Sequence, residues 1–540
     1  MSLVEDIETI IHGEIMEDDA SLSAASKDAS LFTVRPRAVV HPMNTGDVQA
    51  LVRYASSHKN VSLTVRSGGT DMTGGPLSES LVVNMSSHFT RIGRTMGNSI
   101  RVEPGVFYRD MERKVRKKGL LMPSYPASKE ICTVGGMVNN NAGGEKTLSY
   151  GKTEKYIQEL SVVLADGNEY SISALNTSEL MQAMKQKTFL GNVYRELYKL
   201  IENNYDFIQS KKPNVSKNSA GYYLWNVWDR KTFDLTKLFA GSQGTLGITT
   251  NITFRLIKPK KHSALLVLFL PDLTHLTDIV EYLMAYQPAS LESYDDHTLY
   301  LALKLFPSFV KKLKTNIVSL GLQFIPEFSI MFRSGIPKLM LLAEFTGDTK
   351  QEVLVQAQAA QNAVKKWNMP FRIAATKEEQ KKYWTIRRES FNMLRHHVQG
   401  KKTAPFIDDF IVQPKYLPSF LPKLAAILKK YNIDYSIAGH VGNGNFHIIP
   451  LMNFKDKRQL DNIPKVSKEV YDLVFKYNGS STAEHNDGLV RSHVLPQMYG
   501  KKMYGLFEDT KHIFDPKNIF NPRKKIGYDW KWSLKHIVSE

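Results

Sequence analysis

Apolar residues in the first part of the chain recur at spacings that predict a mixture of helices and strands. Over 48–55 they follow helical spacing shortly after Asn44, a residue that favours a helix N-cap, and the alternating run 61–65 predicts a strand. Two apolar runs on either side of Asp166-Gly167 predict a β-hairpin. We therefore expect an α+β fold in this half.

A second pattern begins after the basic run 258–261. The run 264–270 predicts a strand, a helical stretch follows at 279–283, and 339–345 predicts another strand. Because 540 residues exceed what one hydrophobic core usually serves, we expect a domain boundary near residue 260. The alternation of helices and strands predicts that the second domain is an antiparallel sheet of ferredoxin-like type, with helices on one face.

The composition restricts the reactions that this chain can perform more than it restricts the fold that the chain can adopt. Cys132 is the only cysteine, which excludes an internal disulfide, a cysteine-ligated zinc site and an iron–sulfur cluster held by this chain alone. Redox chemistry therefore needs a bound cofactor. The formal charge of +18 comes without a nucleic-acid-binding motif, so we interpret it as a solvated basic surface and expect no specific nucleic-acid partner.

The two ends of the sequence bear on location. The first residues are acidic and amphipathic, unlike a secretory signal, and no apolar run approaches membrane-spanning length, which predicts a cytoplasmic protein. The segment 528–535 mixes aromatic and basic residues. This composition suits peripheral contact with the inner face of a membrane, and it equally suits a docked C-terminal segment.

Three glycine-rich stretches, at 66–75, 133–144 and 241–247, are candidates for ligand binding. Glycine tolerates positive φ and exposes consecutive N–H groups, as an anionic diphosphate requires. Taken alone, each stretch is more often an ordinary turn after a strand. The spacing supports neither a Rossmann dinucleotide site nor a P-loop, since the sequence contains neither Gly-x-Gly-x-x-Gly after the first strand nor a Walker A motif.

The order of these motifs resembles a known family. The chain is similar to the PCMH-type FAD-binding domain of the vanillyl-alcohol-oxidase family at Pro36-Arg-Ala-Val-Val-His-Pro, Ser67-Gly-Gly-Thr, Gly135-Gly-Met-Val-Asn-Asn-Asn-Ala-Gly-Gly, Tyr150-Gly-Lys-Thr and Gly241-Ser-Gln-Gly-Thr-Leu-Gly. The C-terminal half resembles the branch of D-lactate dehydrogenases and glycolate oxidase FAD subunits. The resemblance implies an N-terminal helical segment (1–33), a two-subdomain FAD-binding domain (34–258), an α+β cap domain with a ferredoxin-like antiparallel sheet (259–526) and a basic aromatic tail (527–540).

By this resemblance the cofactor is FAD, lined by the three glycine stretches. The loop expected to cradle the diphosphate contains Arg66, Ser67, Gly68, Gly69, Thr70, Asp71 and Thr73. Further contacts are expected from Thr133, Gly135, Gly136, Asn140, Gly143, Gly144, Gly151, Gly241, Ser242, Gly244, Gly247, Ile248 and Asn521. Thr70 stands where relatives with covalently attached flavin carry a histidine, so we predict that FAD is bound non-covalently.

A second group of residues indicates a metal. His440 and His447 flank a Gly-Asn-Gly-Asn turn, so a hairpin would bring them together, and Glu484 could add an oxygen ligand. From spacing alone, hairpin histidines bonded to backbone and a salt-bridged glutamate explain the pattern equally well. The resemblance favours a divalent metal held by these three residues, with zinc expected ahead of manganese or iron.

Two further residues are expected to act on the substrate. His485 is the candidate general base, because a neutral imidazole can accept the hydroxyl proton near neutral pH. Arg387 is the candidate partner of the substrate carboxylate, since a guanidinium binds carboxylates well. Some relatives carry a lysine shortly before an aspartate here, where this chain has Phe406, so we favour a monocarboxylate substrate over 2-hydroxyglutarate.

These features together predict an FAD-dependent dehydrogenase of a small D-2-hydroxy acid. D-lactate oxidised to pyruvate is the leading substrate, by hydride transfer to flavin N5 with metal-assisted removal of the hydroxyl proton. A quinone, a cytochrome or an electron-transfer protein is the expected acceptor. Alternatives are oxidation of glycolate or D-2-hydroxyglutarate, non-redox flavin chemistry of the alkylglycerone-phosphate synthase kind, and a basic binding protein without catalysis.

Overall fold

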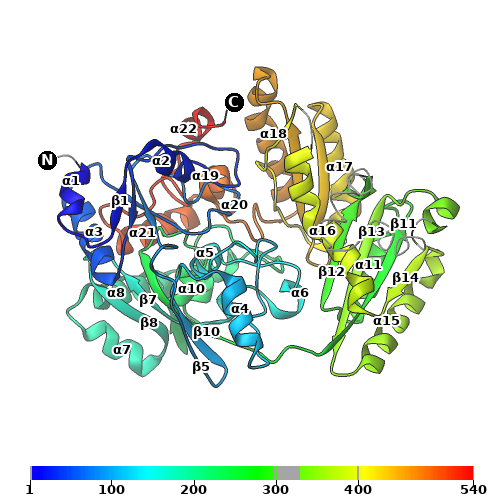
Figure 1. The fold of residues 1–540 in the computed structure, drawn as a ribbon, viewed down its shortest axis with the longest axis horizontal. Helices are drawn as coiled ribbons and strands as arrows, with labels where there is room; N and C mark the ends of the chain where they lie inside the picture. Colours follow the sequence, from blue (N-terminus) through cyan, green and yellow to red (C-terminus); the bar gives the residue numbers. More distant parts are fainter. Residues whose placement is uncertain (1–2, 297, 301–326, 328, 398–399, 539–540) are drawn as a thin grey trace.

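Three β-sheets organise the chain, two in its first half and one in its second (Figure 1). The computed structural model describes residues 3–296, 298–300, 327, 329–397 and 400–538. The first sheet has the strand order β1 (Glu14–Met16), β2 (Ala38–His41), β4 (Leu81–Asn84) and β3 (Leu63–Arg66), with β2, β4 and β3 parallel. The second is antiparallel, in the order β5 (Ile92–Met96), β6 (Ser99–Val102), β10 (Ile248–Arg255), β7 (Ile157–Val163), β8 (Glu169–Asn176) and β9 (Thr232–Asp234).

Several helices of the first half begin at residues whose side chains cap them. Helix α3 follows Asn44, whose side chain accepts a hydrogen bond from the Asp47 N–H, and its buried face carries Val48 and Leu51. The helices of this half are α1 (Leu3–Glu8), α2 (Asp19–Ala25), α3 (Thr45–Ser57), α4 (Tyr108–Arg116), α5 (Val134–Asn140), α6 (Thr147–Tyr150), α7 (Thr177–Lys185), α8 (Phe189–Asn203), α9 (Tyr205–Ser210) and α10 (Thr236–Phe239). The predicted hairpin at Asp166-Gly167 joins β7 to β8.

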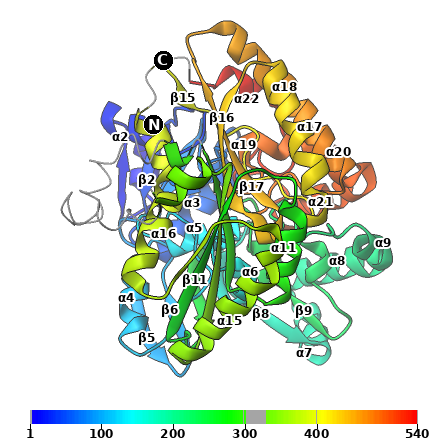
Figure 2. The same cartoon turned by 90° about the vertical axis from the view of Figure 1, so that its right-hand side faces the viewer.

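The third sheet is the framework of the second domain. All its pairs are antiparallel, in the order β14 (Phe371–Ala374), β11 (His262–Leu270), β13 (Leu339–Gly347), β12 (Ser290–Asp295), β16 (Asp434–His440), β17 (Asn445–Met452) and β15 (Lys402–Thr403). One face is covered by α11 (Leu276–Ala285), α15 (Lys350–Val364), α17 (Leu417–Lys430) and α18 (Lys457–Lys476), of which Figure 2 shows α11 and α15 over the strands.

The sequence of strand β11 is an almost continuous run of apolar residues because both faces of the strand are buried. Leu266 and Leu268 pack against the helices of the first face, while Leu265 and Val267 pack under α16 (Lys377–His397) with Tyr383. The α+β class and the antiparallel cap sheet are as predicted, whereas the helix on the opposite face was not anticipated.

The end of the chain returns to the first domain. Helices α19 (Gly488–Arg491), α20 (Leu495–Tyr499) and α21 (Lys501–Phe514) follow the cap, and α20 and α21 are part of the core of the first domain. Phe520 bridges to Leu63 of β3, and the buried Lys511 ammonium donates to the carbonyls of Thr245 and Phe520, each at 2.6 Å. A boundary at 259 therefore separates the strands of the two domains, but residues 495–526 pack with the first, whereas Leu489 and Val490 of α19 belong to the core of the second.

The C-terminal segment, with α22 (Trp530–Lys535), packs against residues 31–33, where Phe32 forms a β-bridge with Ile537. The Thr33 N–H donates to the carbonyl of His536 at 2.8 Å, and Trp530 stacks on His493 with ring centroids 4.0 Å apart. The aromatic tail is thus docked on the protein in this structure. Within the described ranges, no helix has both the length and the apolar character needed to cross a bilayer.

Candidate active site

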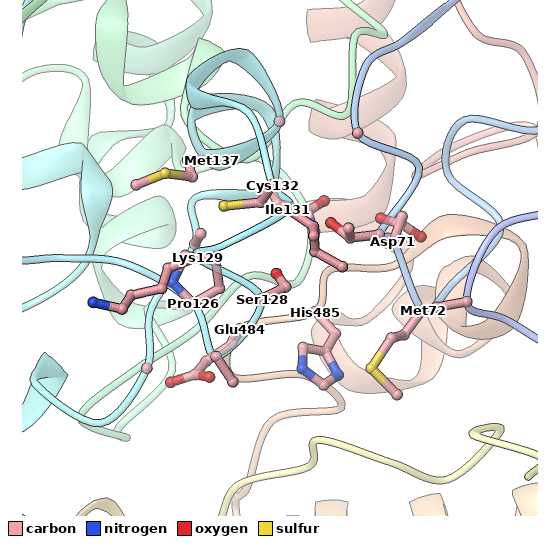
Figure 3. Close-up of a pocket in the computed structure, with 18 of the residues that line it drawn as sticks. Asp71, Met72, Pro126, Ser128, Lys129, Ile131, Cys132, Met137, Glu484 and His485 are labelled. Atoms are coloured by element: carbon pink, nitrogen blue, oxygen red, sulfur yellow. The ribbon is translucent and has the colours of Figure 1, made fainter. Parts of the chain in front are cut away.

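A cavity of about 950 Å³ lies between the two domains. The glycine stretches and the segment 125–133 form its wall on the side of the first domain. The opposite wall is formed by side chains of β12, α16, β16 and β17, together with Asp408, Glu484 and His485. Figure 3 shows the side chains of Glu484 and His485 at the end of this cavity opposite Met137. The cavity therefore joins the predicted cofactor loops to the predicted catalytic residues.

Most of the residues predicted to contact FAD line this cavity. These are Arg66, Ser67, Gly68, Gly69, Thr70, Asp71, Thr133, Gly135, Gly136, Asn140, Gly143, Gly144, Gly244 and Gly247. The others are not among the lining residues: Thr73, Gly151, Gly241, Ser242, Ile248 and Asn521. Several of these hold the loops in place, as Asn521 does when its Nδ2 donates to the carbonyls of Gly75 (3.0 Å) and Gln243 (2.6 Å).

The glycines of the second stretch are required by close packing between loops. A Cβ at Gly135 would lie 2.5 Å from Cβ of Pro104, and one at Gly144 would lie 2.3 Å from the carbonyl oxygen of Tyr125. Both distances are shorter than van der Waals contact, so a side chain at either position would push the stretch away from its neighbour. The glycine stretch 133–144, which we predicted to bind a ligand, thus also shapes the wall of the cavity.

Thr249 gives an independent test of whether the cavity fits a polar cofactor. It lines the cavity from β10, is 4% exposed, and its hydroxyl has no hydrogen-bond partner within the described part of the chain. A buried hydroxyl without a partner costs free energy, so such groups usually face a ligand or water. Together with the exposed loop backbone, this orphan hydroxyl fits FAD, and no sequence pattern pointed to it.

The hairpin β16–β17 brings the two predicted metal-binding histidines together. The ring centroids of His440 and His447 are 5.2 Å apart, and Nε2 of His440 lies 3.3 Å from Oε2 of Glu484. Nδ1 of His440 is 2.6 Å from Oε1 of Glu292, on β12. A carboxylate on Nδ1 orients the ring and leaves Nε2 for the site, the arrangement typical of metal-binding histidines.

Asp408 holds the other two histidines of the site. Its Oδ1 is 3.2 Å from Nδ1 of His447 and its Oδ2 is 2.6 Å from Nδ1 of His485. The two imidazoles are stacked with centroids 4.9 Å apart. One buried carboxylate therefore sets the orientation of a predicted metal ligand and of the predicted base.

Asp409 fixes the backbone of the loop that carries Glu484 and His485. Its Oδ2 accepts from the Thr482 hydroxyl (2.6 Å) and from the backbone N–H groups of Glu484 (2.8 Å) and His485 (2.7 Å). Potential ligand atoms of Asp409, His447, Glu484 and His485 all lie within 4.8 Å of one another. These nitrogen and oxygen donors fit a divalent metal such as zinc, manganese or iron. The group contains the predicted ligands His447 and Glu484 and the predicted base His485, while the predicted ligand His440 adjoins it through Glu484.

Charge pairing dominates the electrostatics of this end of the cavity. Burial alone would raise the pKa of Glu484, but His440 and Lys217 outweigh it and hold that pKa well below its usual range. Burial lowers the pKa of His485, but Asp409 and Asp408 outweigh it and raise the pKa to about 9. A divalent cation among the neighbouring ligands would oppose this rise, because like charges disfavour protonation.

Two adjacent arginines reach the cavity from α16. Nε of the largely buried Arg387 donates to Oε2 of Glu292 at 3.1 Å, so Glu292 links Arg387 to His440. Arg388 instead binds Glu145 through two hydrogen bonds of 2.9 and 2.6 Å. Phe406 is buried in the core of the cap and is not among the residues lining the cavity.

Two family models match the chain, one described as an FAD binding domain, over residues 36–173, and one described as FAD linked oxidases, C-terminal domain, over 259–525. The chain belongs to the FAD-linked oxidase family. The chain is 28% identical over 524 residues to D-2-hydroxyglutarate dehydrogenase of Pseudomonas putida, covering 95% of this chain and 50% of that protein. It is 25% identical over 501 residues to D-lactate dehydrogenase of Archaeoglobus fulgidus, covering 91% of this chain and 93% of that protein.

This chain spans about half the length of the D-2-hydroxyglutarate dehydrogenase from Pseudomonas putida. Its fold is similar to that of 4-ethylphenol oxidase from Gulosibacter chungangensis, with a TM-score of 0.68 at 15% identity over 98% of this chain and 97% of that chain. The predicted family, the PCMH-type α+β fold and the FAD cofactor are confirmed by these similarities.

Proposed function

We propose that this protein oxidises a small D-2-hydroxy acid. The observation that carries the proposal is the placement of His440, His447, Glu484 and His485 at one end of a cavity whose other walls are the glycine stretches. When bound, FAD supplies a two-electron acceptor for the hydrogen on the hydroxyl-bearing carbon, and a divalent metal supplies a Lewis acid for the hydroxyl oxygen.

The chain's own residues would bind and deprotonate the substrate. Arg387 is placed to hold the carboxylate, and the link through Glu292 fixes its guanidinium relative to His440. His485, oriented by Asp408, would accept the hydroxyl proton at Nε2. His440, His447 and Glu484 would hold the metal, with Glu292 and Asp408 orienting the two imidazoles.

D-lactate remains our leading substrate, and D-2-hydroxyglutarate is a second candidate. The argument against the dicarboxylate rested on Phe406, a position outside the cavity lining, while Lys381 and Arg388 line the same wall as Arg387. The relatives described above include enzymes named for either acid.

The decisive experiment is the anaerobic addition of D-lactate, L-lactate, glycolate and D-2-hydroxyglutarate to the purified FAD-bound protein. We expect the flavin absorbance to bleach with one D-2-hydroxy acid and not with L-lactate. If none of the four reduces the flavin, the proposed function is wrong, and non-redox flavin chemistry becomes the better explanation. His485→Ala should abolish bleaching while FAD stays bound, and unchanged reduction kinetics would remove His485 from the mechanism.

The two arginines allow a matched test of carboxylate binding. Arg387→Lys should raise KM by about 10- to 100-fold, the loss expected when one charge-assisted hydrogen bond of about 1.5–3 kcal/mol is removed. Arg388→Lys is the matched control on the next residue of α16, because that guanidinium binds Glu145 through both Nε and Nη2 and is not assigned to the substrate. Equal effects of the two substitutions would contradict the assignment of Arg387.

We also propose that a quinone, a cytochrome or an electron-transfer protein reoxidises the flavin. The single cysteine excludes an iron–sulfur relay built from this sequence alone, so the flavin would pass its electrons to a carrier outside this sequence. Comparing reoxidation rates of the reduced flavin by a soluble quinone, cytochrome c and oxygen tests this step. Oxygen as the fastest of the three would mean that the protein is an oxidase and not a dehydrogenase.

A further inference from the structure

Residues 216–221 of the FAD-binding domain lie behind the histidine cluster, which consists of His440, His447 and His485. The Ser219 N–H donates to the carbonyl of Thr482 at 3.0 Å, and the Gly221 N–H donates to Oδ2 of Asp487 at 2.9 Å. Residues 216–221 therefore run along the loop that carries Glu484 and His485. Since this loop follows the cap sheet in the chain, the contact joins the two domains directly at the site.

Lys217 is the residue of this segment that reaches the cluster. Its side chain is 0% exposed, and its ammonium donates to Oε1 of Glu484 at 2.5 Å and to Oδ1 of Asn445 at 3.0 Å. Burying an ammonium is costly unless it is paired and hydrogen-bonded. Here its partners are a predicted metal ligand and the last residue of the turn between His440 and His447.

The two oxygens of Glu484 have different surroundings. Oε2 lies 3.3 Å from Nε2 of His440, on the side where the ligands converge. Oε1 is held by Lys217, in a space that a Cβ at Gly143 would enter, coming within 3.0 Å of Oε1. The ammonium and the absence of a side chain at residue 143 together assign Oε1 to Lys217.

We propose that Lys217 is a positioning residue that makes Glu484 a ligand through Oε2 alone. A carboxylate bound by one oxygen occupies one coordination position, so that two histidines and Glu484 leave a position open, as catalytic zinc sites do. Because Lys217 belongs to the FAD-binding domain, it also fixes the metal ligands relative to the cofactor loops. The inference rests on the proposed metal site of the preceding section.

The test is X-ray absorption spectroscopy of the zinc-loaded, FAD-bound protein and of its Lys217→Met variant. In the unsubstituted protein we expect a first shell of two nitrogens and a single carboxylate oxygen, plus solvent. Methionine has a similar length without charge or N–H donors, so Lys217→Met should release Oε1 and add one zinc–oxygen contact. Filling the open position should slow flavin reduction by the proposed substrate about 10- to 100-fold.

A second buried lysine provides the matched control. Lys152 is 3% exposed and its ammonium donates to the carbonyls of Asn218 (2.7 Å) and Ala483 (2.6 Å) and to the Ser219 hydroxyl, none of which is a predicted ligand. Lys152→Met should therefore lower thermal stability and leave the zinc coordination unchanged. A zinc shell altered equally by both substitutions would show that any buried lysine has this effect, and would overturn the role of Lys217.

The outcomes separate this inference from the proposed function. A bidentate Glu484 in the unsubstituted protein, measured without any variant, refutes the positioning role even if Lys217→Met does not fold. Unchanged coordination in Lys217→Met refutes it as well, while metal-dependent oxidation of the hydroxy acid stands. A purified protein that takes up no divalent metal refutes both the metal site and the role of Lys217, whereas flavin bleaching by substrate would still support the dehydrogenase.

Discussion

Asp408→Asn tests whether one carboxylate sets the tautomers of two histidines. Both oxygens of Asp408 accept from Nδ1 atoms, of His447 at 3.2 Å and of His485 at 2.6 Å, which leaves each Nε2 facing the site. Asparagine has the same shape but only one acceptor oxygen, since its other terminal atom is a donor. One of the two histidines must then give up its Nδ1 hydrogen bond or present a bare Nδ1 and carry its proton on Nε2.

The size of the effect depends on which histidine changes. A change at His447 should weaken metal binding by about 10- to 100-fold, the usual cost of losing such an orienting carboxylate, or about 1.4–2.7 kcal/mol. A change at His485 should slow flavin reduction by up to about 10⁴-fold, the effect of an Asp→Asn substitution behind the catalytic histidine of a serine protease. We therefore expect at least about 10-fold slower reduction of the flavin by substrate.

Three measurements on Asp408→Asn distinguish these outcomes. Anaerobic stopped-flow absorbance gives the rate of flavin reduction, metal titration gives the affinity of the site, and the visible spectrum confirms that FAD is retained. Asp408 is buried, and the substitution conserves side-chain volume, so we expect the fold to stay intact. Thermal unfolding checks this expectation. Reduction rate and metal affinity both within threefold of the unsubstituted protein, with the fold intact, would refute the orienting role of Asp408.

Three further predictions concern the cofactor cavity and the docked tail. Thr249→Val removes an unpaired hydroxyl, so it should stabilise the FAD-free protein yet weaken FAD binding by about 0.5–1.5 kcal/mol. Equal FAD affinities of the two proteins, measured by calorimetry, would exclude a contact between Thr249 and FAD. Gly135→Ala should cost about 1–3 kcal/mol of stability and lower flavin content, because its Cβ would collide with Pro104; unaltered unfolding and flavin occupancy would contradict this. Burial lowers the pKa of His493 to about 4, so its contribution to stability is present above an unfolded-state pKa of about 6.5 and is lost as the pH falls towards 4. His493→Phe keeps a ring stacked on Trp530 and should reduce the loss of thermal stability between pH 7.5 and pH 5, and an equal loss in both proteins would refute the assignment.

Sequence patterns predicted the features that depend on local structure. The cap at Asn44, the hairpin at Asp166-Gly167 and the pairing of His440 with His447 across β16–β17 are set by residues close together in the chain. Spacing and turn residues carry this information. The family resemblance added the FAD cofactor, which no single glycine stretch established.

The residues that the sequence did not reveal come from distant parts of the chain. Glu292 precedes its partner His440 by 148 residues, and Lys217 precedes Glu484 by 267. No periodicity links positions that far apart in the chain. In the sequence, Glu292 and Lys217 therefore cannot be distinguished from any other buried glutamate or lysine. Asp408 was visible next to Asp409, but its two histidine partners become evident only when the loops are folded together.

The return of the chain to its first domain has a consequence for biosynthesis. Residues 495–520 complete a core that the first 258 residues begin, so a ribosome has to synthesise the chain to about residue 520 before that core can close. Until then the nascent FAD-binding half exposes apolar surface that calls for chaperone protection. We therefore expect flavin uptake to follow closure of this core, and a fragment ending near residue 258 should aggregate instead of forming a yellow protein.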